Sequence, residues 1–227
     1  MIKPEKDAFG QEIWAHYNGE RSVEIVEVET GYIDASSGPP AYFSEYKDWP
    51  KHWKRAIKFV KGRTIDIGAG AGRVSLYLQD KEYNILAIDN SPLAIKVCKL
   101  RGVKKTKVIS ITEINSKLGK FDTILMLGNN FGLFGNYKRA KWLLKRFHSI
   151  TNPDVRIIAE SNDPYNTTNR DHLEYHKLNR KRGKMSGQIK IRIRHKKTIG
   201  NWFEYLLVSK KEMADILRGT GWKTSQY

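Results

Sequence analysis

Short apolar runs alternate with helix-like segments through the middle of the chain. Five of the apolar runs have the length of a strand: 64–67, 84–88, 108–111, 121–127 and 155–160. Three segments between them have helical spacing: 73–79, 92–102 and 137–150. Strands that alternate with helices of this length pair in parallel, with helices covering both faces of the sheet. The pattern therefore predicts an α/β core.

The two ends of the chain do not follow this alternation. The first 55 residues are rich in aromatic side chains, with a strand-like alternation of apolar and acidic residues at 23–29. After residue 160, isoleucine alternates with lysine or arginine over 189–194, which predicts a strand, and 202–208 is its expected antiparallel partner. Ser209 with Glu212 three residues later is a capping-box pattern that begins a last helix.

Composition narrows the class of protein without naming a function. A chain of 227 residues is ample for a buried core, and its single cysteine, Cys98, excludes an internal disulfide and a thiolate metal cluster. No metal site is expected. The first residues are charged and lack the apolar segment of a signal peptide, and no apolar run is long enough to span a bilayer. We therefore expect a cytoplasmic protein that does not enter a membrane.

Positive charge is unevenly distributed along the chain. There are 41 basic and 24 acidic residues, a net charge of +17, and residues 177–197 contain ten lysines and arginines with no acidic residue. Two interpretations stay open for this stretch. It is either a solvated face of a lysine-rich protein or a surface for a nucleic acid or another anionic partner.

The strongest local signal is a glycine-rich turn after the 64–67 strand. Glycines 68, 70 and 72 permit positive φ angles, and the helix that follows presents free amide groups. Asp66 precedes the turn, and Asp89 ends the next strand, where a carboxylate can accept hydrogen bonds from ribose hydroxyls. A dinucleotide fingerprint would have a third glycine where Arg73 stands. The pattern therefore predicts an adenosine ligand with a cationic amino-acid tail, against the alternative of a purely structural turn.

Three segments resemble motifs of class I S-adenosylmethionine-dependent methyltransferases: Asp66 to Gly72, Leu86 to Pro92 and Phe121 to Asn130. The resemblance implies methyl transfer from S-adenosylmethionine, with S-adenosylhomocysteine as product. Residues 110–112 depart from the family, which often has an acidic residue there. By this likeness, the cofactor-binding residues are Asp66, Gly68, Ala69, Gly70, Gly72, Arg73, Asp89, Asn90, Ser91, Ser110, Ile111, Thr112, Leu127, Gly128 and Asn129.

The resemblance also implies a Rossmann-like three-layer sandwich with a mostly parallel sheet. The expected parts are 1–55, a helical and aromatic lid on the substrate side; 56–160, the cofactor-binding core; 161–208, an inserted segment with a β-hairpin after the fifth strand; and 209–227, the last helix and the start of a strand. The family's sheet ends with two antiparallel strands, of which only the beginning fits here, at 222–227. We expect either an incomplete chain or a hairpin, 189–208, that covers the exposed sheet edge.

The acceptor of the methyl group is the least determined feature. Candidate catalytic residues, by their positions in strand-end loops, are Asn129, Asn130, Tyr165 and His172. Residues 162–165 look like the tetrad of amino-directed nucleic-acid methyltransferases, but they follow the wrong strand and are more simply a turn. We favour a small molecule enclosed under the lid. The alternatives are RNA, DNA or a protein guided by residues 177–197, or a non-catalytic binding module. The oligomeric state is left open.

Overall fold

The computed structural model describes residues 2–36 and 38–225, and these form two β-sheets with helices around them. In the first sheet the order is β5-β4-β3-β6-β7, and all neighbours are parallel. Its strands are β3 (Thr64–Ile67), β4 (Ile85–Asp89), β5 (Thr106–Val108), β6 (Phe121–Met126) and β7 (Thr151–Ala159). This arrangement confirms the predicted Rossmann-like α/β core.

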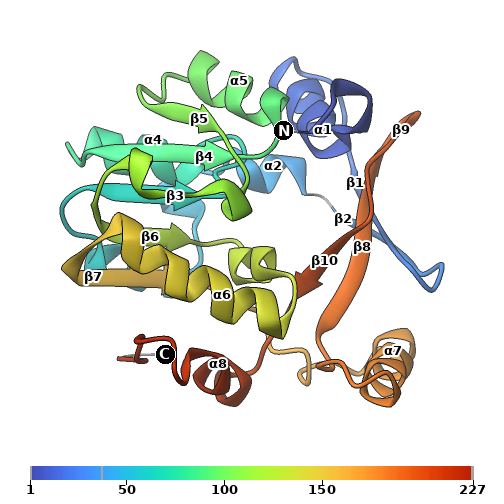
Figure 1. The fold of residues 1–227 in the computed structure, drawn as a ribbon. Helices are drawn as coiled ribbons and strands as arrows, with labels where there is room; N and C mark the ends of the chain where they lie inside the picture. Colours follow the sequence, from blue (N-terminus) through green and yellow to red (C-terminus); the bar gives the residue numbers. More distant parts are fainter. Residues whose placement is uncertain (1, 37, 226–227) are drawn as a thin grey trace.

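The second sheet is antiparallel and has the order β10-β8-β1-β2, with β9 paired to β8. Figure 1 shows this second sheet lying across the C-terminal ends of the parallel strands, which the arrowheads mark. Its strands are β1 (Glu24–Val28), β2 (Ile33–Ser36), β8 (Gln188–His195), β9 (Thr198–Ile199) and β10 (Phe203–Leu206).

Helices cover both faces of the parallel sheet because successive strand residues point to opposite sides. In β6, Ile124 packs in a cluster with Leu143 of α6, whereas Leu125 packs with Trp53 of α3 and Val74 of α4. The α-helices are α1 (Ala8–Tyr17), α2 (Pro39–Tyr42), α3 (Lys51–Ala56), α4 (Arg73–Asp80), α5 (Pro92–Leu100), α6 (Tyr137–Phe147), α7 (Arg170–Lys181) and α8 (Lys210–Leu217). The 3₁₀ turns are η1 (Pro4–Lys6), η2 (Tyr46–Asp48), η3 (Ile57–Phe59), η4 (Ile111–Glu113), η5 (Ser116–Leu118), η6 (Asn130–Phe134) and η7 (His148–Ile150). Among the described residues, no helix is long and apolar enough to cross a membrane.

The predicted helix starts are present. The Ser91 hydroxyl accepts a hydrogen bond from the Ala94 amide at 3.0 Å, with Pro92 in the first turn of α5. Ser209 and Glu212 form a reciprocal capping box at the start of α8. These local signals fix where α5 and α8 begin.

The predicted hairpin exists but does not cover the edge of the parallel sheet, so that expectation is wrong. β8 pairs with β10, as predicted, and its other edge pairs with β1 instead of β7. The physical reason is charge, because the acidic side chains of β1 match the basic ones of β8. Arg192 donates two hydrogen bonds to Glu27, both at 2.8 Å.

The expected C-terminal strand is also not formed in the part of it that the structure describes. Residues 222–225 have no strand, while Gln226 and Tyr227 lie outside the described residues. The Trp222 indole donates to the carbonyl oxygen of Leu144 at 2.8 Å and stacks on His148, with ring centroids 4.8 Å apart. This packing against α6 and η7 uses the apolar surface of Trp222 that a strand would have presented to the sheet.

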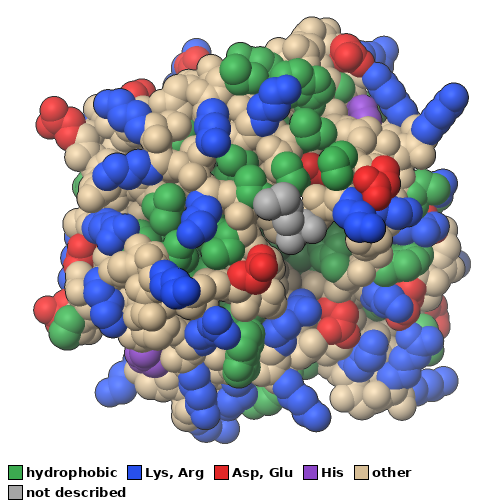
Figure 2. Space-filling model, turned by 45° about the horizontal axis from the view of Figure 1, so that its top comes forward, with side chains coloured by type: hydrophobic (Ala, Val, Ile, Leu, Met, Phe, Trp, Pro, Cys, Tyr) green, Lys and Arg blue, Asp and Glu red, His purple; other side chains and the backbone are tan. Residues whose placement is uncertain are grey.

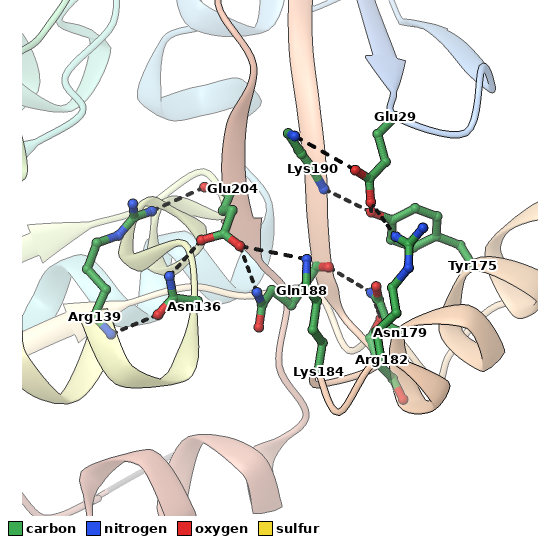
Figure 3. A network of polar contacts seen from close by, with 11 residues as sticks. Glu29, Asn136, Arg139, Tyr175, Asn179, Arg182, Lys184, Gln188, Lys190 and Glu204 are labelled. Atoms are coloured by element: carbon green, nitrogen blue, oxygen red, sulfur yellow. Dashed lines mark hydrogen bonds and ion pairs between the residues drawn. The ribbon is translucent and has the colours of Figure 1, made fainter.

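A polar network joins the second sheet to the core and to α7 (Figure 3). The Glu204 carboxylate of β10 accepts hydrogen bonds from Asn136 at 2.6 Å and from Gln188 at 2.8 Å. On the other side, Glu29 accepts from Arg182 at 2.9 Å and from Tyr175 at 3.0 Å. The N-terminal and inserted segments, predicted as separate parts, are thus held together in one sheet above the strand ends.

Candidate active site

The glycine turn has the backbone shape that the sequence predicts. Gly68, Gly70 and Gly72 have φ angles of 77°, 55° and 81°, in the left-handed region that favours glycine. A Cβ added to Gly68 would lie 2.6 Å from the side-chain nitrogen of Asn130. One added to Gly70 would point toward Tyr42 at 3.9 Å, and toward two residues of α1 at similar distances. The bare backbone of the turn therefore faces α1 and α2.

Two buried carboxylates lie beside this turn. The two oxygens of Asp89 accept from the Gly70 amide at 3.0 Å and the Ser91 amide at 2.9 Å, and Asp66 accepts from the Ser75 hydroxyl at 2.7 Å. Burial raises the pKa of Asp66 and of Asp89 to about 6, and hydrogen bonds to each carboxylate limit the increase. Each carboxylate oxygen has two lone pairs. Both groups can therefore still accept hydrogen bonds from a ligand.

The loop after β6 is positioned by Glu160, whose role no motif in the sequence indicates. Its carboxylate accepts from the amides of Gly128 at 2.6 Å and Asn129 at 3.1 Å, and it contacts His52 Nε2 at 2.8 Å. Burial works to raise the pKa of Glu160, but hydrogen bonds to its carboxylate outweigh burial and lower it. Asn129 has a φ of 62°, and this anchored carboxylate supports its strained backbone.

Asn130 connects this loop to the glycine turn. Its side-chain nitrogen donates to the carbonyl oxygens of Ile67 at 3.0 Å and Gly68 at 2.9 Å. Next to it, the side-chain oxygen of Asn129 is buried and has no hydrogen-bond partner among the described residues. The structure therefore gives Asn130 a positioning contact and leaves Asn129 with an acceptor for a ligand.

Arg73 contacts both α2 and α3 next to the glycine turn. Its guanidinium group lies over the ring of Trp53, 4.1 Å from the centroid, and donates to the carbonyl oxygen of Ala41 at 2.5 Å. Leu127 is buried in the same cluster as Trp53. These contacts keep α2 and α3 close to the ends of β3 and β6.

The remaining predicted cofactor residues surround the end of β4 and the segment after β5. Asn90 is exposed, and the Ser91 hydroxyl donates to Asp7 at 2.8 Å. Ser110 begins η4, where its hydroxyl accepts from the amide of Thr112 at 3.3 Å. The strand before it ends at Val108, so Ile111 lies in this turn and not in a strand.

Two of the four catalytic candidates lie elsewhere. Tyr165 is 53% exposed and donates to Glu212 of α8 at 2.8 Å. His172 contacts the Thr167 hydroxyl at 3.1 Å and meets the ring of Tyr32 edge-on. Tyr165 therefore lies against α8, and His172 lies in α7 next to the turn between β1 and β2, whereas Asn129 and Asn130 lie at the glycine turn.

The assembled groups fit an adenosyl ligand with a cationic amino-acid tail. The bare glycine backbone lets a ligand approach closely, Asp89 offers acceptors to ribose hydroxyls, and Asp66 adds negative charge near the cationic tail. The unpartnered oxygen of Asn129 adds one more buried acceptor in the neighbouring loop. No part of this donor and acceptor set conflicts with such a ligand.

Comparison with known proteins agrees with this chemistry. Residues 65–154 match the family model described as a methyltransferase domain. The structure resembles a S-adenosylmethionine-dependent methyltransferase from Bacteroides fragilis in complex with S-adenosylhomocysteine, with a TM-score of 0.81, 26% identity, and coverage of 100% of this chain and 94% of that one. A methyltransferase from Methanosarcina mazei shares the fold at a TM-score of 0.57 and 18% identity, over 76% and 84% of the two chains.

A curated relative adds a more distant sequence match. Glycine/sarcosine N-methyltransferase from Halorhodospira halochloris is 24% identical over 104 residues, which are 43% of this chain and 39% of that protein. The match thus spans well under half of the relative's length. In fold, in the chemistry of the site and in sequence over residues 65–154, the chain is thus similar to the class I S-adenosylmethionine-dependent methyltransferases.

Proposed function

We propose that this protein transfers a methyl group from S-adenosylmethionine to a small-molecule acceptor enclosed between the glycine turn and the second sheet, in the cytoplasm. The observation that carries the proposal is the position of α2 and β10 over the site. Tyr205 of β10 donates to the carbonyl oxygen of Asn129 at 2.6 Å, and Tyr42 faces Gly70. These contacts on the acceptor side of the glycine turn leave little room for a large acceptor.

For methyl transfer, the protein mainly has to position the acceptor relative to the methyl group. S-adenosylmethionine supplies an electrophilic methyl group on a sulfonium ion. An in-line displacement needs the acceptor atom aligned with the sulfur–carbon bond and water kept away. The loop at Gly128 and Asn129, anchored by Glu160, lies where the family resemblance expects the methyl group. We assign Glu160 and Asn130 to positioning the site.

The basic stretch 177–197 supports a small acceptor better than a polyanion. Figure 2 shows lysine and arginine side chains spread over the visible face, with acidic side chains among them. Partial neutralisation of this kind weakens attraction to phosphates. Seven of the ten basic residues form ion pairs: Lys177, Arg182, Lys184, Lys190, Arg192, Arg194 and Lys196.

Label transfer tests the proposed acceptor class. The purified chain is incubated with S-adenosylmethionine carrying a labelled methyl group and a cell extract, which is then separated into small-molecule, protein and nucleic-acid fractions. We expect the label in the small-molecule fraction, and none above background with the Asp89→Ala variant. Label in RNA, DNA or protein would overturn the small-acceptor proposal. Binding of the cofactor without transfer to any fraction would identify a non-catalytic module.

A further inference from the structure

A fully buried carboxyl group without a hydrogen-bond donor lies at the edge of the candidate site. Glu12 of α1 has no exposed surface, and apart from the neighbouring Glu24 carboxyl group, with which it can share a proton, no described residue offers its carboxyl oxygens a hydrogen bond. An ionised carboxylate in such a place would be strongly destabilising, and a protonated carboxyl group still leaves buried acceptor lone pairs without a donor. Stability of the fold therefore does not account for a glutamate at this position.

A second carboxyl group and two tyrosines adjoin Glu12. Glu24, on β1, interacts with Glu12 and accepts a hydrogen bond from the Tyr42 hydroxyl at 2.5 Å. The charge of Glu24 also raises the pKa of Tyr205, after the effect of burial. Three elements of the N-terminal segment, α1, β1 and α2, and the distant strand β10 bring these four groups together.

This acidic pair is connected to both loops of the cofactor site. Tyr42, which donates to Glu24, is one of three residues that line the space beside Gly70, with its ring 3.9 Å from a Cβ added there. Tyr205 reaches the loop on the other side, through its hydrogen bond to Asn129. The pair therefore lies on the acceptor side of the glycine turn, between α1 and the second sheet.

We propose that Glu12 and Glu24 bind the ammonium group of the methyl acceptor, so that the protein methylates the nitrogen of small primary or secondary amines. This inference rests on the proposed methyltransferase function and names the acceptor class. An ammonium group presents up to three N–H donors and no acceptor, which complements two carboxyl groups and the free oxygens of Glu12. A hydroxyl or carboxylate acceptor would supply one donor at most.

The proton balance is consistent with such an acceptor. Burial, followed by the proximity of Glu24, raises the pKa of Glu12 to about 9, so at neutral pH this group is protonated before an amine arrives. An entering ammonium ion favours the ionised form, and Glu12 releases its proton to solvent. For transfer, the ammonium nitrogen gives a proton to this carboxylate. The nitrogen lone pair then forms the bond to the methyl carbon, while the sulfur–carbon bond breaks and its electrons stay on sulfur.

Calorimetry with matched probes tests the proposal without turnover. The probes are glycine and phenethylamine, with glycolate and 2-phenylethanol as the alcohol counterparts, each titrated into the protein saturated with S-adenosylhomocysteine. Titrations in two buffers of different ionisation enthalpy measure the protons released on binding. We expect at least one amine to bind at least tenfold more tightly than its alcohol, with net release of a proton near pH 7.

Variants separate this role from a structural one. Glu12→Gln and Glu24→Gln should each weaken amine binding at least tenfold, Glu12→Gln should abolish proton release, and S-adenosylhomocysteine binding should change less than twofold. The matched control is Glu20→Gln, a partly exposed glutamate paired with Lys196, which should leave all three quantities unchanged. Circular dichroism confirms that each variant is folded.

The outcomes distinguish the two proposals. Amine binding that is unaffected by both substitutions, or equal binding of amines and alcohols, would overturn the amine site. Binding of S-adenosylhomocysteine without any binding of the amine probes would also overturn it, while leaving the methyltransferase assignment intact. Loss of S-adenosylhomocysteine binding in the unaltered protein would instead contradict the proposed function itself.

Discussion

The buried Glu12 carboxyl group makes the stability of the free protein decrease as pH rises. Its pKa is 4.5 in an ordinary environment and about 9 in the fold, because burial and then the nearby Glu24 carboxyl group disfavour the charged form. Between these values the folded chain holds a proton that the unfolded chain has released. The free energy of unfolding therefore falls with increasing pH across this window. Glu12→Gln keeps the shape of the side chain and removes this titration.

The size of the effect follows from one proton. Each pH unit inside the window changes the free energy of unfolding by about 1.4 kcal/mol per proton. From pH 6 to pH 8, the free energy of unfolding of Glu12→Gln should therefore rise by up to about 3 kcal/mol relative to that of the unaltered chain. For a chain of this size, that corresponds to a relative rise in Tm of about 6–12 °C.

Thermal and urea unfolding at several pH values between 6 and 8 measure this difference. Asp66 and Asp89, whose pKa values burial raises to about 6, also titrate in this range, but they are common to both proteins and cancel in the comparison. Glu20→Gln, the exposed control, should run parallel to the unaltered chain. If the Glu12→Gln curve also runs parallel to it, Glu12 is ionised in the fold, and the reasoning from its burial is wrong.

Three further substitutions test the geometry of the site. Gly68→Ala forces a left-handed φ on alanine and a contact with Asn130, and should lower the free energy of unfolding by about 1–2 kcal/mol or more in urea. Asn130→Ala leaves two carbonyl oxygens without their donor and should lower the free energy of unfolding by about 1–3 kcal/mol. It should also weaken S-adenosylhomocysteine binding in calorimetry and leave the pH profile of turnover unchanged. A shifted profile would make Asn130 more than a positioning residue. Tyr205→Phe loses one hydrogen bond to Asn129 and should raise the KM for the acceptor while S-adenosylhomocysteine affinity stays within twofold; the reverse would place Tyr205 on the cofactor side.

Local signals in the sequence were sufficient for the parallel core and the glycine turn. Buried apolar runs such as β3, the cap at Ser91 and the spacing of the glycines each depend on neighbouring residues only. The strand predicted at 108–111 is β5 at Thr106–Val108, because Ser110 can begin a turn as readily as residues 108–111 can extend a strand. The structure assigned that polar residue to a cap.

Contacts between distant residues were the part that the sequence did not reveal. The second sheet pairs β1 with β8, whose residues 27 and 192 are opposite each other, and no local pattern predicts which edge a hairpin will join. The roles of Glu12 and Glu160 have the same origin. One is a glutamate in a short helix and the other directly follows β7, and each gains its function only from elements packed around it.

Isothermal titration of S-adenosylhomocysteine into the unaltered protein and into Asp89→Asn tests the central assignment most directly. Asp215→Asn, an exposed residue of α8 paired with Arg218, is the matched control. We predict binding by the unaltered protein and the control, and a loss of roughly tenfold or more in Asp89→Asn, the size expected for hydrogen bonds to a charged group. No binding to the unaltered protein, or equal binding by Asp89→Asn, would contradict the placement of the cofactor at the glycine turn.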